Sequence, residues 1–189
     1  MFKIKTYLEK LYYDYGNPYI MDNPKERYID IDDSLKISEI IDHRKFTADC
    51  IQEFISIEYN NKSIVNFDVP SGLSLWEDTY LPAIEGYIQN GKVEIMYGID
   101  PILLSLEESN NNEMLLSIYD EWKPNDIYVE EFLPQNEFIE SLLDNASHYY
   151  EKLMEYKITE DRELRHSSSK DYPVEMLNTI LELRKQIKR

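Results

Sequence analysis

Residues 93–144 read VEIMYGIDPILLSLEESNNNEMLLSIYDEWKPNDIYVEEFLPQNEFIESLLD, and the spacing of their apolar positions predicts the centre of the fold. Apolar residues alternate with polar ones in three segments: Val93, Ile95 and Tyr97; Ile102, Leu104 and Leu106; Met114, Leu116 and Ile118. A period of two is typical of strands with one buried face. Ile127 and Val129 predict a shorter strand.

A long helix should follow this sheet. Pro134 is well placed for a first helical turn, and the apolar residues after it recur every three or four positions to about Tyr156. This spacing gives a helix one apolar stripe, as expected where a helix lies on a sheet.

Upstream of the sheet, two elements have recognisable ends. Alternation over residues 53–59 and 65–69, on either side of Asn60-Asn61-Lys62, predicts a hairpin. Ser74, with Glu77 three residues later, resembles a capping box and predicts a helix that runs to Asn90-Gly91. Pro82 lies inside this run, so we expect the helix to be kinked or split there.

Other segments give weaker patterns. Apolar residues in 2–15 have helical spacing, whereas residues 27–41 fit strand and helix about equally. The segment 162–170 is typical of a connector, and residues 173–187 predict a final helix.

These elements predict an α+β fold: an antiparallel sheet of about five strands with helices packed mainly on one face. Residues 1–160 should form one domain, with a helical or irregular part over 1–50, the sheet over 51–131 and the long helix over 134–157. Residues 161–189 should form a connector and the C-terminal helix.

Negative charge is concentrated in the middle of the chain. Residues 93–144 hold thirteen acidic residues and one base, Lys123, and so carry -12 of the formal net charge of -17. A pI near 4.5 argues against binding to nucleic acid or to an anionic membrane surface, because both would repel the protein. Cys50 is the only cysteine, which excludes an internal disulfide, and no signal peptide or membrane span is apparent. We therefore expect a cytoplasmic protein.

If the alternating apolar residues face the core, the period of two places carboxylates and aromatic rings together on the opposite face. The predicted partner-binding residues are Glu94, Glu107, Tyr119, Glu121, Trp122, Tyr128 and Glu130. Tyr and Trp are favoured at binding hot spots, and an acidic field attracts a basic partner. Leu103 and Leu115 should share this face. The alternative is a solvated face that keeps the protein soluble.

Signals for catalysis are weak. The sequence has no glycine-rich phosphate loop and no metal-binding pair of histidines. We therefore expect that the protein is not an enzyme and that it binds no cofactor. Residues 30–33 (DIDD) fit a strand end or a helix cap better than a cation site. A divalent-metal site built from Glu107-Glu108, Asp120-Glu121 and Glu130-Glu131 is the enzymatic alternative.

In its acidic strands from Val93 to Glu131 and its tyrosine content, the chain resembles the immunity proteins of bacterial polymorphic toxin systems. Leu81-Pro82 and Asn90-Gly91 are similar to features of one such superfamily, the SUKH group, although its usual glycine pair is absent. The resemblance implies a non-enzymatic protein that neutralises a basic toxin or nuclease domain by covering its active site.

Two further classes remain open at this level. A nucleic-acid mimic would block a DNA-handling protein with carboxylates in the place of phosphates, and it would need those carboxylates spaced along the face. An oligomeric structural protein is the other class. The sequence leaves the oligomeric state unknown.

Overall fold

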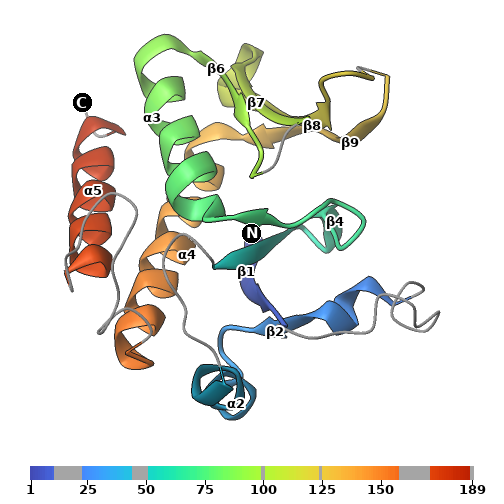
Figure 1. The fold of residues 1–189 in the computed structure, drawn as a ribbon. Coiled ribbons are helices and arrows are strands. Elements are labelled where there is room, and N and C mark those ends of the chain that lie inside the picture. Colours follow the sequence, from blue (N-terminus) through green and yellow to red (C-terminus); the bar gives the residue numbers. More distant parts are fainter. Residues whose placement is uncertain (11–22, 44–50, 99–100, 124, 158–170, 188–189) are drawn as a thin grey trace.

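The computed structural model describes residues 1–10, 23–43, 51–98, 101–123, 125–157 and 171–187. The fold is α+β, as predicted, but its strands form two antiparallel sheets instead of one. Figure 1 shows α3, α4 and α5 together on one side of the molecule, with the two sheets beside them. None of the described helices is long and apolar enough to cross a membrane.

The first sheet has the order β2-β1-β3-β4, and β5 pairs with β3. Its strands are β1 (Phe2–Glu9), β2 (Tyr28–Asp30), β3 (Gln52–Tyr59), β4 (Lys62–Val65) and β5 (Gly72–Leu73). The predicted hairpin is present, but its second strand is Lys62–Val65, and residues 66–69, which were expected to continue that strand, form a turn. The hairpin turn residues Asn60 and Asn61 have φ of 50° and 65°, the left-handed conformation that a two-residue hairpin turn requires.

β1 corrects the prediction of a helix at the N-terminus. Strand β1 lies between β2 and β3, and its residues from Thr6 to Glu9 are all buried. A strand covered on both faces carries apolar residues at successive positions, so the period of two is lost. The spacing of Ile4, Tyr7 and Leu8 therefore matches a helix by coincidence. Residues 11–22 lie outside the described part of the chain.

Between the hairpin and the second sheet lies a helical segment in two parts. A π-helical segment, η3 (Leu75–Tyr80), continues into α3 (Leu81–Asn90), so the predicted split is present next to Pro82. Gly91 ends α3 at φ 69°, in the left-handed conformation. The capping box is not formed, because Ser74 has φ 48° and makes no side-chain cap hydrogen bond.

The second sheet has the order β6-β7-β8-β9. Its strands are β6 (Lys92–Met96), β7 (Ile102–Glu108), β8 (Glu113–Asp120) and β9 (Ile127–Pro134). Strand β9 is longer than predicted and leads directly into α4 (Gln135–Glu155). The ambiguous segment divides into β2 and α2 (Ser34–His43), and short 3-10 turns lie at η1 (Pro24–Arg27) and η4 (Asn110–Asn112).

One hydrophobic core joins both sheets to the helices. Helix α4 places Phe138, Leu142, Tyr149 and Leu153 in this core, and the C-terminal helix α5 (Tyr172–Ile187) adds Ile180 and Leu183. α5 therefore packs onto the domain that was expected to end near residue 160. The expected connector at 161–170 lies outside the described residues.

Candidate functional site: the outer face of the second sheet

The outer face of the second sheet is the surface of β6–β9 that points away from the core. The inner side chains, among them Leu104, Leu116 and Ile118, are fully buried, as the alternation predicted. On the outer face, the strand register aligns side chains in three rows of four. The apolar row contains Met96, Leu103, Tyr119 and Ile127. The middle row contains Glu94, Ser105, Ser117 and Glu130, and the third row contains Lys92, Glu107, Leu115 and Phe132.

Four of the seven predicted binding residues stand in these rows: Glu94, Glu107, Tyr119 and Glu130. Tyr128 is an extra residue of β9, because Ile118 pairs with Val129 while Tyr119 pairs with Ile127. Tyr128 is 41% exposed beside the apolar row. Leu103 and Leu115 lie on this face, as predicted.

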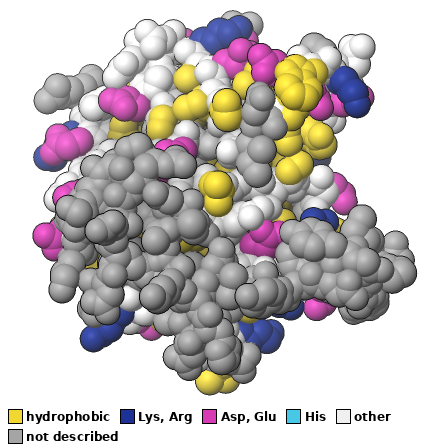
Figure 2. Space-filling model, viewed as in Figure 1, with side chains coloured by type: hydrophobic (Ala, Val, Ile, Leu, Met, Phe, Trp, Pro, Cys, Tyr) yellow, Lys and Arg dark blue, Asp and Glu magenta, His cyan; other side chains and the backbone are white. Residues whose placement is uncertain are grey.

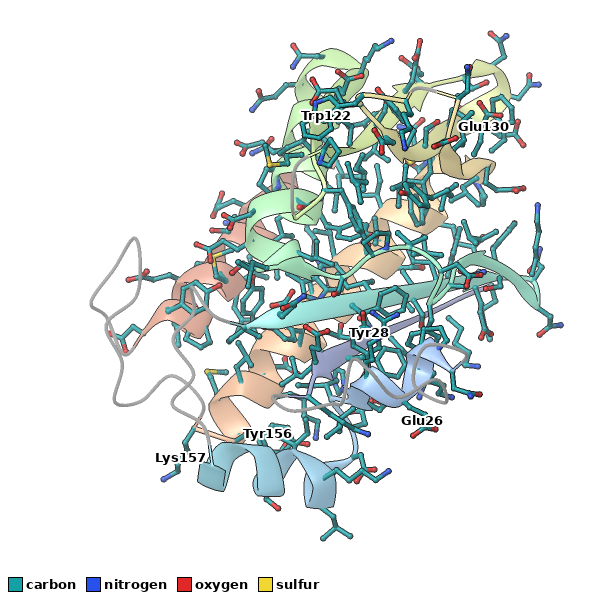
Figure 3. The ribbon with its side chains drawn as sticks, turned by 45° about the vertical axis from the view of Figure 1, so that its right-hand side comes forward. Glu26, Tyr28, Trp122, Glu130, Tyr156 and Lys157 are labelled. Carbon is teal, nitrogen blue, oxygen red and sulfur yellow. The ribbon has the colours of Figure 1, made fainter. Side chains whose placement is uncertain are left out.

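Glu121 and Trp122 lie in the turn after β8, next to the apolar row. The Asp120 carboxylate accepts hydrogen bonds from the backbone N–H groups of Trp122 and Lys123, at 2.8 and 2.9 Å. The N–H of Glu121 donates to the carbonyl of Pro101 at 2.7 Å, which ties the turn to the start of β7. Hydrogen bonds from the backbone N–H groups of the turn therefore fix its conformation. The Trp122 side chain is 72% exposed. Figure 3 places Trp122 and Glu130 at the end of the molecule opposite Tyr156.

Negative charge on this face is only partly neutralised. Lys92 forms an ion pair with Glu107 at 2.8 Å. The Tyr119 hydroxyl donates to the Glu94 carboxylate. Burial, this hydrogen bond and the charges of Glu94 and Glu121 raise the pKa of Tyr119 to about 12. Within the described residues, no cation forms an ion pair with Glu94, Glu121 or Glu130, although Lys92 also lies close enough to Glu94 for their charges to interact.

The acidic residues of 93–144 do not all share this face. Glu131 points to the other side of β9 and forms an ion pair with Lys62 of β4. On α4, Glu137 lies 3.2 Å from the N-terminal amine, and Asp144 forms an ion pair with Arg184 of α5. These carboxylates join parts of the fold to one another. The outer face therefore combines a few unneutralised carboxylates with apolar side chains.

The apolar part of the face is larger than the sequence predicted. Met96, Ile127 and Phe132 are 49%, 50% and 55% exposed. Met96 is two residues from Glu94 in β6 and lies on the same face. Ile127 was expected to share a face with Val129, and the bulge at Tyr128 places it on the opposite face. Phe132 was missed because β9 was expected to end before it. Figure 2 shows hydrophobic side chains exposed beside acidic ones in the upper part of the view.

A buried carboxyl group lies elsewhere, in the first sheet. Glu53 of β3 is 2% exposed and accepts hydrogen bonds from the backbone N–H of Trp76, at 3.2 Å, and from the Tyr149 hydroxyl. Burial raises the pKa of Glu53 to about 8. The Trp76 indole donates to the Thr6 hydroxyl at 3.0 Å, and this hydroxyl donates to Asn145 at 3.0 Å. These bonds, which we call the Glu53 network, connect β1, β3, η3 and α4.

The acidic pairs considered for a metal site are not assembled. Neighbouring strand residues point to opposite faces, which separates Glu107 from Glu108 and Glu130 from Glu131. No group of three or more metal-ligating side chains occurs among the residues that the structure describes.

The DIDD segment at 30–33 takes the expected structural roles. Asp30 pairs with Lys5 at 2.5 Å, Asp32 lies 2.7 Å from His148, and Asp33 accepts from the backbone of Lys36 in α2 at 3.3 Å.

Comparison with known proteins finds no relative: no family model matches the chain, and neither a curated protein nor a solved structure matches it significantly.

Proposed function

We propose that this chain is a non-enzymatic inhibitor of the immunity type, which neutralises a basic toxin domain by stoichiometric binding through the outer face of its second sheet. The observation that carries the proposal is the composition of this face. Glu94, Glu121 and Glu130 form no ion pair among the described residues, and the same surface exposes the rings of Trp122 and Tyr128.

Each component has a physical role in such a complex. Carboxylates attract a cationic partner over a distance and raise its association rate, and this effect weakens as salt is added. Tyrosine and tryptophan rings provide large contact areas at a low cost in side-chain entropy. A partner whose active site is lined by Lys and Arg, as in a nuclease, would be blocked by such a surface.

A nucleic-acid mimic is the weaker alternative. It needs carboxylates at regular intervals in the place of phosphates. On the outer face, the two glutamates of the middle row are separated by Ser105 and Ser117, and the next row is apolar. Exposed apolar side chains match the surface of a folded protein better than the groove of a duplex.

Growth rescue tests the proposal. The candidate partner is the protein encoded by the adjoining reading frame if it ends in a small basic domain. We expect this domain to stop the growth of a laboratory bacterium and the present chain to restore it. The triple variant Glu94→Lys, Glu121→Lys and Glu130→Lys should lose the rescue, because it reverses the unneutralised charges. Glu107 is left in place since Lys92 already neutralises it.

The matched control reverses three exposed glutamates on the helices, Glu85, Glu151 and Glu182, to lysine. This control changes the net charge equally and should retain the rescue. Rescue by the first triple variant would assign binding to another surface. If the chain does not restore growth against any basic domain encoded in an adjoining reading frame, the proposal as a whole is contradicted.

A further inference from the structure

The apolar row is the part of the outer face that charge alone does not explain. Met96, Leu103, Tyr119 and Ile127 stand directly opposite one another across all four strands. Its end members, Met96 and Ile127, are about half exposed, and Trp122 at 72% and Tyr128 at 41% extend the same surface. Contiguous exposed apolar surface of this kind is uncommon on proteins that act alone and marks interaction sites.

The middle row has small side chains at its centre and carboxylates at its ends. Its two central residues, Ser105 and Ser117, have small side chains, whereas both flanking rows carry larger ones. Glu94 and Glu130 stand at the two ends of the same row. With neighbouring strands about 4.8 Å apart, the two carboxylates lie on strands roughly 14 Å apart. The Tyr119 side chain reaches Glu94 on this face. An element that crosses the strands would therefore meet this ring, the apolar row and a carboxylate at each end.

The charges select the occupant. Two copies of this chain that docked face to face would bring Glu94, Glu121 and Glu130 of both copies together, and the burial of like charges is costly. A cationic segment neutralises the same groups. Arg or Lys at its ends can reach Glu94 and Glu130 while its apolar side chains cover the apolar row.

We infer that the partner contributes an amphipathic cationic segment that lies across β6–β9, with apolar side chains on the row of Met96, Leu103, Tyr119 and Ile127, and with basic side chains at Glu94 and Glu130. This inference rests on the proposed inhibitor function and specifies the chemistry of its partner. The two components have separate kinetic roles: carboxylates set the association rate, and desolvated apolar contacts set the dissociation rate.

Selection from a random peptide library on the full chain tests this inference without knowledge of the natural partner. We expect the selected peptides to combine two or more basic residues with apolar residues. The double variant Met96→Ser and Ile127→Ser should raise the dissociation rate of these peptides at least tenfold, with little change in the association rate. The double variant Glu94→Gln and Glu130→Gln should instead lower the association rate and weaken its dependence on salt.

A matched control removes two apolar side chains elsewhere, at Leu35 and Leu181, which are 78% and 54% exposed. Leu35→Ser with Leu181→Ser should leave both rates unchanged. The inference is overturned if the library yields no basic amphipathic peptide. It is also overturned if the double variant Met96→Ser and Ile127→Ser does not change the dissociation rate of the selected peptides. Growth rescue that depends on the three carboxylates would still support the inhibitor function. Conversely, peptide binding at the apolar row without any growth rescue would contradict the inhibitor function alone.

Discussion

The Glu53 network and the outer face of the second sheet use the same residue types, carboxylates, tyrosines and tryptophan, in opposite ways. In the network, Glu53, Trp76 and Tyr149 are buried, and their polar atoms bond to one another. On the outer face, Glu130, Trp122 and Tyr128 are exposed, and their side chains form no hydrogen bond within the described part of the chain. Residue type alone therefore does not distinguish side chains that stabilise this fold from side chains that are available for binding. Burial and hydrogen bonding do distinguish them.

The two tryptophans give the largest contrast. Trp76 is fully buried and Trp122 is 72% exposed. Trp76→Ala should lower the free energy of unfolding by about 3–5 kcal/mol, because it removes a large core side chain and leaves a cavity. Trp122→Ala should change it by less than about 0.5 kcal/mol, as is usual for exposed positions. Urea denaturation followed by circular dichroism measures both variants. Equal losses would remove the distinction between the two regions.

The pH dependence of stability sharpens the comparison at the next level. The pKa of Glu53 is about 8 in the folded protein and about 4.5 when the chain is unfolded. Between these pH values Glu53 keeps its proton in the folded state but has released it in the unfolded state. The stability that the protonated Glu53 contributes is therefore complete below about pH 4.5 and is lost as the pH rises to 8.

Glu53→Gln should remove this loss, which is on the order of a few kcal/mol, since glutamine cannot ionise. The measurement is urea denaturation of wild type and variant at several pH values between 4.5 and 8.5. The stability of the wild type should fall more steeply than that of the variant. Parallel pH profiles for the two proteins would show that Glu53 ionises normally. On the outer face, Glu130→Gln is the control for a glutamate-to-glutamine change at an exposed position.

The smallest effect concerns the hydroxyl of Tyr119. Burial and the nearby Glu94 and Glu121 raise its pKa to about 12. Glu94→Gln removes a negative charge and should move this pKa toward 10, the ordinary value. Ultraviolet difference titration of Glu94→Gln against wild type reports the change, and Tyr119→Phe identifies the signal. If the Tyr119 signal titrates at the same pH with and without Glu94, the carboxylate is not at the hydroxyl.

The outer face illustrates how far residue order can predict a site. Alternation in residues 93–118 placed Glu94, Glu107 and Leu103 on the correct side, because the direction of a side chain in a regular strand depends only on its position. It failed for Ile127, since a bulge shifts the alternation by one residue and its origin lies in the pairing with β8. Phe132 was missed for a related reason: the length of β9 depends on the partner strand that extends it.

The network shows the opposite limit. Nothing near Glu53 in the sequence indicates that its carboxyl group is buried. Its partners Trp76 and Tyr149 are far away in the chain and arrive through the packing of η3 and α4 on β3. The number of sheets could not be predicted for the same reason: even where a strand can be recognised locally, its neighbours in the sheet cannot.

Local patterns therefore sufficed for the α+β class, the hairpin at Asn60-Asn61, the split at Pro82 and the long helix α4, since turns, helix breaks and apolar periodicity act over a few residues. Tertiary contacts alone decided that β1 is a strand, that some acidic residues pair with Lys62 and Arg184, and that an apolar row lies among the others. Those outcomes depend on which distant segments come into contact. Such contacts are determined by burial of apolar surface and by strand pairing over the whole chain.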